Sequence, residues 1–324
     1  MLYANQGTVA RTELLPEPHA NPAAAVWLDL LQGKDEERSL AERLTGLRVP
    51  SLHDLSEIES SSRLSTERGA LYLSSPMHYL DSEGQSQTVP IGFVLSREHL
   101  LTVRFAAAPV FDSFAQRFNT QDQAPCSVAA FVGLLEAIVD RLADVLEHIG
   151  MELESISRRV FKPEVPGASP AKTDAQLRAT LRNIGRAGER LSNLRDSLVG
   201  IQRMVLYAGE TASAWIPTEQ KPRLTVLRQD IASLADYDSQ MANKVQFLLD
   251  ATLGFINIEQ NNGIKVLTVV SVVGVPPTLV ASIYGMNFKW IPELQWEYGY
   301  FYGLGVIVAS AIVPLIWFKK RGWI

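Results

Sequence analysis

The sequence predicts an α+β cytosolic domain followed by a long stalk helix and two C-terminal transmembrane helices. Three observations predict this fold class. Short apolar segments bounded by Gly, Pro and Ser occupy the first third of the chain. From Arg223 no residue stops a helix until the tandem prolines Pro276 and Pro277. Two long uncharged runs, 266–284 and 298–318, follow near the end of the printed sequence.

Composition excludes several classes of function. The formal net charge is -5, and the basic residues are scattered except at the C-terminal end, so nucleic acid is not expected as a partner. Cys126 is the single cysteine, which excludes an internal disulfide framework and a cysteine-based zinc cluster. The N-terminus lacks the basic start and apolar core of a signal peptide, so we expect this part of the protein to stay in the cytosol.

Residues 1–125 are predicted to form the cytosolic α/β domain. Its strand signals are short, rich in β-forming residues and bounded by turn residues or charge. They cover residues 24–31, 69–80, 88–96 and 99–105. We therefore expect a small sheet with intervening helices.

The next segment, 126–222, is predicted to be a long helical hairpin. Residues 127–161 have apolar side chains at helical spacing and no proline, and a second helix is expected from about Asp174 to Tyr207. The Pro- and Gly-rich segment 162–170 separates the two, which predicts an antiparallel pair. After a further break, 223–265 is predicted to be a stalk helix that continues into the first span.

The two uncharged runs, 266–284 and 298–318, are each close to the ~20 residues that a helix needs to cross a membrane. Buried core helices are the alternative, but such helices rarely lack a polar face over this length. The basic C-terminus, 319–324, lies beside Trp317 and Trp323, as at a cytosolic membrane interface. A cytosolic C-terminus after two spans leaves 285–297 as an external loop.

One face of the long helix carries small or polar residues, although the helix is otherwise rich in Val, Leu and Ile. We call this face the stripe. Steps of four and three residues place these positions on it: Asp250, Gly254, Asn257, Asn261, Ile264, Thr268, Ser271, Val275, Thr278, Ser282 and Gly285. A surface that faces lipid does not carry such residues. The stripe predicts either close packing between helices or the lining of a water-filled pore.

Two spans cannot enclose a conduit, so transport requires a ring of protomers with closed rotational symmetry. The seven-residue repeat of the stalk is suited to such self-association. Pro276 and Pro277 remove backbone donors, which predicts a kink or freed carbonyls near Val272 and Val273. At the outer end, the carboxamide of Asn287 could contact a hydrated dication, which suits Mg²⁺ because this ion sheds water reluctantly.

The segment from Tyr284 to Phe288 reads Tyr-Gly-Met-Asn-Phe and resembles the signature of the CorA family of divalent-cation channels. The segments "GFINIEQN" (254–261), "PEL" (292–294) and the ending "WFKKRGWI" extend the likeness, which is densest over residues 245–300. The resemblance implies a homopentamer with a CorA-like funnel of cytosolic domains. It also implies that the first span lines the pore and that the second faces lipid.

The resemblance further assigns roles to individual residues. Gly285, Met286 and Asn287 would form the ion-selectivity site, with Glu293 in the outer loop near the mouth. Asp250 would lie at the cytosolic mouth of the pore, and an exposed helix aspartate is the alternative. The residues that would line the pore are Asn257, Asn261, Ile264, Leu267, Thr268, Ser271, Val275, Thr278 and Ser282.

Regulation is less clearly marked in the sequence. Several family members sense cytosolic Mg²⁺ through a stalk carboxylate, but Val226 stands at the matching place here. Asp230, Asp236 and Asp238 are the nearby candidates for a regulatory metal site. Lys289 also adds a positive charge to the outer loop, where comparable relatives are often acidic.

The expected function is passive transport of Mg²⁺, with Co²⁺ or Ni²⁺ as co-substrates, across a bacterial inner membrane. The partners are further copies of the chain, lipid and the ion. A Zn²⁺ transporter of the same superfamily is one alternative, and a non-conducting membrane-anchored signalling or scaffold protein is another. No P-loop, dinucleotide turn or nucleophile elbow is found, so we expect neither an enzyme nor a cofactor.

Overall fold

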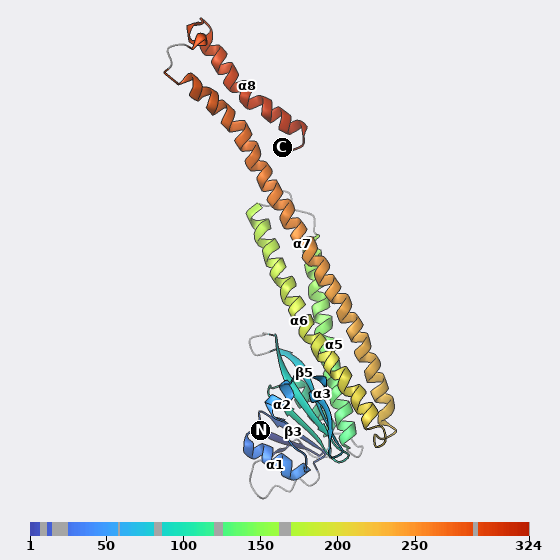
Figure 1. The fold of residues 1–324 in the computed structure, drawn as a ribbon. Coiled ribbons are helices and arrows are strands. Elements are labelled where there is room, and N and C mark those ends of the chain that lie inside the picture. Colours follow the sequence, from blue (N-terminus) through green and yellow to red (C-terminus); the bar gives the residue numbers. More distant parts are fainter. Residues whose placement is uncertain are drawn as a thin grey trace. The chain divides into compact units, whose positions relative to one another are not determined.

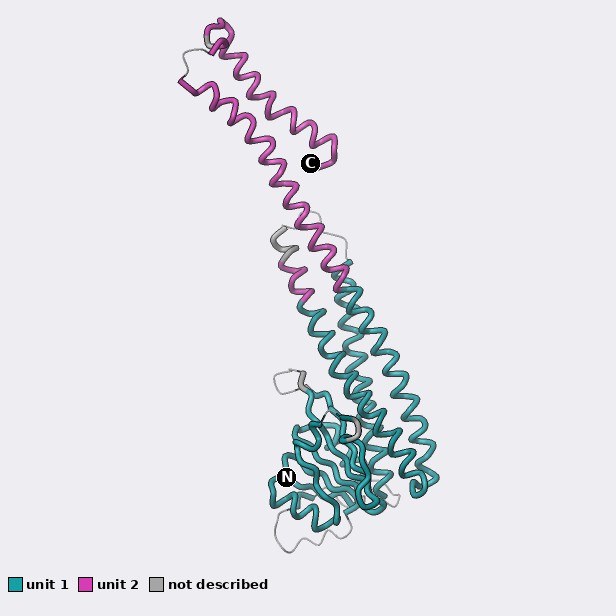
Figure 2. Tube along the Cα trace, viewed as in Figure 1, with its two compact units in different colours: residues 1–161, 182–248 teal, residues 162–181, 249–324 magenta. Residues whose placement is uncertain are grey.

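The structure is a computed structural model that describes residues 1–6, 12–14, 25–57, 59–80, 86–119, 126–161, 170–287 and 291–323. Figure 1 shows its helices and strands. The chain divides into two compact units (Figure 2): residues 1–161 with 182–248 form unit 1, and residues 162–181 with 249–324 form unit 2.

A single sheet organises unit 1. The strand order among the described residues is β2-β1-β3-β7-β6-β5-β4. β3 and β7 are parallel, and the other neighbours are antiparallel. The strands are β1 (Leu2–Asn5), β2 (Thr12–Leu14), β3 (Trp27–Leu31), β4 (Leu64–Glu67), β5 (Ala70–Leu80), β6 (Ser86–Leu95) and β7 (Leu100–Arg104).

The four predicted strands are confirmed as β3, β5, β6 and β7. β1, β2 and β4 were not predicted. They have only three or four residues each, and β2 and β4 lie at the two edges of the sheet. Pairing with a neighbour, rather than a local alternation of apolar residues, holds such short segments in the strand conformation.

Helices cover both faces of the sheet. The short helices α1 (Asp35–Thr45) and α2 (Leu52–Ser56) contribute Leu40 and Leu55 to one apolar cluster, and α3 (Ser60–Arg63) follows them in the chain. α4 (Pro109–Phe118) lies on the other face, where Trp27 contacts Phe114 with ring centroids 5.4 Å apart. α5 (Ser127–Val160) joins it there through Phe131, 5.8 Å from Phe93.

Within unit 1, α5 and the parts of α6 (Pro170–Thr211) and α7 (Gln220–Tyr284) that belong to this unit run side by side (Figure 1). Ion pairs join α5 to both others: Arg190 of α6 lies 3.0 Å from Glu152, and Lys244 of α7 lies 2.7 Å from Glu154. The predicted helical pair is confirmed, and the predicted helix from Arg223 to Tyr284 is present without interruption.

Unit 2 contains the two predicted spans. The C-terminal part of α7 is followed by a short 3₁₀ helix, η1 (Pro292–Gln295), and by α8 (Gly299–Lys320). Both long helices are apolar enough to cross a membrane, and only 0% and 11% of their apolar windows are buried within the chain. A core helix of a soluble domain would be mostly buried, so the low burial favours the predicted membrane spans over the alternative.

Candidate functional site

The stripe lies on the exposed surface of α7 in unit 2. Its apolar members are exposed to solvent: Ile264 is 63% exposed and Val275 is 62% exposed. The adjoining Leu267 is 68% exposed. Asn257, Asn261 and Ser282 are exposed as well. These residues share one face because an α-helix repeats every 3.6 residues. The face is therefore available to contact water or another chain.

The stripe hydroxyls bond to their own helix. Thr268 and Ser271 donate to the carbonyl oxygens of Ile264 and Leu267 at 2.8 and 2.9 Å. Thr278 and Ser282 donate to carbonyls one turn back at 2.9 and 2.7 Å. Because each hydrogen is used within the helix, the hydroxyl oxygen keeps acceptor lone pairs for an outside donor. Water bound to a cation is such a donor.

A groove of about 930 Å³, measured with the open space around it, follows the C-terminal part of the stripe. Ser271, Val275, Thr278 and Ser282, which the sequence places on one face of the helix, line it. Gly274 lines it as well and was not predicted. Its spacing could have indicated it, since Gly274 lies three residues after Ser271 and four before Thr278. A glycine also has no side chain to fill the groove.

The tandem prolines do not end the helix. Pro276 and Pro277 lie inside α7, which continues to Tyr284. Each proline lacks the N–H that would bond to Val272 or Val273, so those two carbonyl oxygens have no backbone partner four residues on. At membrane depth such groups require protein or water as a partner. This is the second source of acceptor oxygens along α7.

The Gly-Met-Asn segment ends the first span. The N–H of Gly285 donates to Ala281 at 3.0 Å, and the N–H of Met286 donates to Ile283 at 3.2 Å, so the last turn tightens. Gly285 does not have a positive φ, so an unusual backbone turn does not explain why glycine occupies this position. A Cβ at this position would lie 3.3 Å from the Ala281 oxygen, which is a tight contact. Met286 and Asn287 are exposed.

Glu293 lies in the turn between the spans. It lines a pocket of about 1030 Å³ together with Tyr284, Gly285 and Tyr300. A Cβ on Gly299 would collide with the carbonyl oxygen of Glu293, so the turn closes tightly onto the start of α8. The predicted outer-loop carboxylate thus lines the same pocket as the first residue of the predicted selectivity site. Lys289 lies outside the described residues.

The other end of α8 has the side chains of a membrane interface. The guanidinium of Arg321 lies 4.9 Å from the centre of the Trp317 ring, and the Trp323 ring lies 5.3 Å from that of Phe318. Lys319 and Lys320 are exposed in the last turn. Aromatic rings with adjacent basic groups are typical of the boundary between lipid and water.

The acidic candidates on α7 are not brought together. Asp250, Asp230 and Asp236 are exposed, whereas Asp238 is 1% exposed. Burial raises the pKa of Asp238, and the charge of Arg195, 3.8 Å away, opposes the shift. Within the described ranges no group of three His, Cys, Asp or Glu side chains could hold a metal ion.

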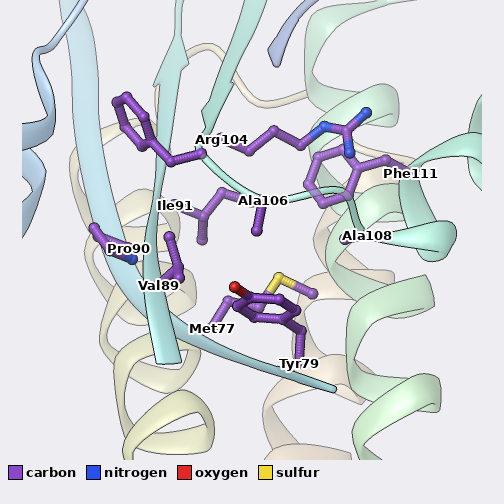
Figure 3. Close-up of a pocket in the computed structure, with 10 residues that line it drawn as sticks. Met77, Tyr79, Val89, Pro90, Ile91, Arg104, Ala106, Ala108 and Phe111 are labelled. Carbon is purple, nitrogen blue, oxygen red and sulfur yellow. The ribbon is translucent and has the colours of Figure 1, made fainter. Parts of the chain in front are cut away.

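A small cavity beside the sheet, drawn in Figure 3, is not a ligand site. It measures about 270 Å³ including the open space around it, but the space that a water molecule can enter is only about 20 Å³, room for about one water. The Arg104 guanidinium beside it lies 4.7 Å from the centre of the Phe111 ring (Figure 3). Arg104 also pairs with buried Asp29, a contact that sequence reasoning missed because its two residues are far apart in the chain.

The fold and this site define a class: an integral membrane protein with an α/β domain and a two-helix hairpin whose first helix carries a polar stripe. The family described as "CorA-like Mg2+ transporter protein" matches residues 22–320. "Magnesium transport protein CorA" of Haemophilus influenzae is 32% identical over 316 residues, covering 97% of each chain. The protein belongs to the CorA-like Mg²⁺ transporter family.

Two solved structures share the fold. The complete CorA magnesium transporter from Methanocaldococcus jannaschii aligns with a TM-score of 0.77 at 19% identity, covering 100% of this chain and 99% of that one. The full-length CmaX protein aligns with a TM-score of 0.70 at 16% identity, covering 99% and 97%. The sequence had also suggested a closer kinship to CmaX, but an identity this low shows a common fold alone.

Proposed function

We propose that this protein is a passive channel for divalent cations, chiefly Mg²⁺, with Co²⁺ and Ni²⁺ as further substrates. One observation carries the proposal: the polar stripe of α7 runs along the span and ends at Gly285, where the Gly-Met-Asn segment begins. Membership of the CorA-like family supports it. The relative from Haemophilus influenzae is itself a magnesium transport protein.

Gly285, Met286 and Asn287 form the selectivity site in this proposal. A neutral carboxamide accepts hydrogen bonds from the water around an ion without stripping that water away, and Mg²⁺ keeps several of its waters. Glu293, which lines the same pocket as Gly285, adds negative charge that attracts cations to the mouth.

The conduit itself requires several copies of the chain. We place five protomers around an axis, with the stripe of each α7 facing inward and each α8 facing lipid. The groove along Ser271, Val275, Thr278 and Ser282 then becomes part of a wet pore. Asn257 and Asn261 continue the polar lining inward, and Asp250 supplies a ring of carboxylates at the cytosolic mouth.

The proposed location is a bacterial inner membrane, with both termini in the cytosol and the Gly-Met-Asn loop outside. A potential of ~100 mV supplies ~2.3 kcal/mol per elementary charge, so about 4.6 kcal/mol drives each dication inward without ATP. The basic end of α8 supports this orientation.

The test is Mg²⁺ influx into proteoliposomes that hold an indicator dye, at an imposed inside-negative potential. Asn287→Ala should abolish selective influx and leave the oligomer intact by size-exclusion chromatography. Gln295→Ala, which removes another exposed carboxamide from the outer turn, is the matched control and should conduct.

Undiminished Mg²⁺ influx through Asn287→Ala would refute the assigned selectivity site. Parallel assays with Zn²⁺ decide between the ions, and carriage of Zn²⁺ but not Mg²⁺ would favour the zinc-transporting alternative. A well-assembled wild-type protein that passes no divalent cation under any gradient would favour the non-conducting scaffold.

A further inference from the structure

The edge strand β4 pairs with only part of its neighbour β5 in the sheet of unit 1. β4 pairs with β5 as far as Leu64 and Leu73, whereas β5 continues to Leu80 along β6 on its other side. Helix α6 approaches the uncovered part, where the N–H of His78 donates to the Ser197 hydroxyl at 2.9 Å. A Cβ on Gly200 would collide with the Ser75 hydroxyl, so helix and strand are in close contact.

A pocket of about 400 Å³ remains where β4 begins, between this edge and α6. Three arginines line it: Arg63 from the end of α3, and Arg195 and Arg203 from α6. Asp196 is the carboxylate among the lining residues, so the charged side chains around the pocket are positive in sum. The volume is that of a site for a small molecule.

Arg63 and Arg195 are held by contacts that leave donors available. Arg63 uses its Nε to donate to the carbonyl oxygen of Glu57 at 2.6 Å. Arg195 donates through Nη2 to the Ser239 hydroxyl at 3.1 Å. A guanidinium carries five N–H groups, so each of these two side chains keeps donors beyond the contact that orients it. Several guanidiniums around one cavity are suited to phosphate oxygens.

Ser74 supplies an independent indication of a ligand. Ser74 is among the residues that line the same pocket, it is only 5% exposed, and its buried hydroxyl has no hydrogen-bond partner among the described residues. A buried hydroxyl without a partner destabilises a folded protein, and a specific one requires an explanation. A polar ligand in the pocket would satisfy it.

We propose that this pocket binds the phosphate group of a small phosphorylated metabolite. The phosphate oxygens accept hydrogen bonds from Arg63, Arg195 and Arg203, and the Ser74 hydroxyl completes the site. The rest of the ligand contacts the apolar wall formed by Leu64 and Val199. No aromatic side chain is among the lining residues, so the phosphate rather than a stacked base is recognised.

The pocket is connected to the long helix α7 through Arg195. This side chain contacts Ser239 and lies 3.8 Å from the Asp238 carboxylate, both on α7. A phosphate on Arg195 competes with Asp238 for the same positive charge. Ligand binding is thus expected to change the charge environment of the helix that also carries the stripe.

The test is isothermal titration calorimetry on the full-length protein in detergent, in buffer free of divalent cations so that chelation does not contribute. The probes are glucose 6-phosphate and inorganic phosphate. Arg63→Gln and Arg203→Gln should each weaken binding at least about tenfold. Ser74→Ala should weaken it about threefold to tenfold without lowering the Tm of the free protein, because it removes an unsatisfied hydroxyl.

Two further variants distinguish a specific binding site from general attraction of phosphate to positive charge. Asp196→Asn removes the carboxylate and should tighten binding. Arg186→Gln removes an exposed arginine of the same helix outside the pocket and should leave binding unchanged. Tighter binding of glucose 6-phosphate identifies an organic phosphate as the ligand, and tighter binding of inorganic phosphate identifies the free ion.

Absence of saturable binding of both probes up to about 10 mM, a concentration above the range of specific metabolite sites, would overturn the proposal. An equal loss of affinity in Arg186→Gln and Arg203→Gln would overturn it as well. The outcome does not depend on ion transport, so the proposed channel function and the phosphate site can fail separately.

Discussion

Arg104 holds Asp29 by both carboxylate oxygens across the parallel strands β3 and β7. Its Nε lies 3.1 and 3.2 Å from the two oxygens, and its Nη2 lies 2.9 Å from Oδ2. The Thr102 hydroxyl donates to the same carboxylate at 2.8 Å. Both charged side chains are almost fully buried, so each depends on the other for compensation of its charge.

Asp29→Ala should therefore destabilise the protein by about 3–5 kcal/mol, because it leaves the Arg104 charge buried without its main partner. Asp112→Ala is the control. Its carboxylate lies 3.6 Å from the same guanidinium but is 56% exposed, so its loss should cost less than about 1 kcal/mol. Thermal unfolding of both variants in detergent measures the difference, and equal Tm values would contradict the assignment.

Asp238 should make stability depend on pH. Burial raises the pKa of its carboxyl in the folded protein, so the folded state binds a proton more tightly than the unfolded state does. The stabilising contribution is complete below the ordinary pKa of an aspartate, about 3.9, and is lost as pH rises through the higher folded-state pKa.

Asp238→Asn should remove this pH dependence and raise stability at neutral pH, because it removes a carboxylate charge that burial disfavours. Thermal unfolding between pH 4 and 8 provides the measurement. Asp236→Asn, an exposed neighbour on the same helix, should keep the wild-type profile. A parallel loss of stability with pH in wild type and Asp238→Asn would show that another group is responsible.

The hydroxyls of the stripe should affect flux more than folding. The Ser271 hydroxyl donates to the carbonyl oxygen of Leu267 in its own helix, and in the proposed channel it faces the pore rather than a neighbouring helix, so Ser271→Ala should leave assembly unchanged. Loss of an acceptor oxygen facing the pore should reduce Mg²⁺ influx about threefold to tenfold.

Ser310→Ala is the matched control, because Ser310 donates to a carbonyl of its own helix, α8, at 2.7 Å. Size-exclusion chromatography and proteoliposome influx are measured together. If the stripe serves only helix packing, the oligomer of Ser271→Ala will dissociate, or its flux will match that of Ser310→Ala.

Asp250 should act through long-range attraction. Asp250→Asn should lower Mg²⁺ flux a few-fold at low ionic strength, because a carboxylate ring at the mouth concentrates cations. The difference from wild type should disappear near 1 M monovalent salt, where the screening length falls to about 3 Å. Asp230→Asn, another exposed aspartate of α7, is the control, and a deficit in Asp250→Asn that salt does not change would point to a structural role.

The predicted functional site was read mainly from local patterns. Ser271, Thr278 and Ser282 line one groove because they repeat at the helical period, and that period is visible in the sequence. Gly285 illustrates a limit, because its place on the stripe is visible in the sequence, whereas only the backbone shows that it has no positive φ and that a Cβ there would lie 3.3 Å from the Ala281 oxygen. The assembly of several stripes into a pore remains a prediction.

By itself the sequence determined the long helices, the two spans and the face of α7 that carries polar groups. These features depend on apolar length and on repeats within a few turns, so neighbouring residues are sufficient to specify them. Only the tertiary structure decided which strands flank β3, that Asp29 meets Arg104, and that Arg63 shares a pocket with Arg203. Those contacts join residues far apart in the chain, and they exist only once the whole sheet and its helices have packed.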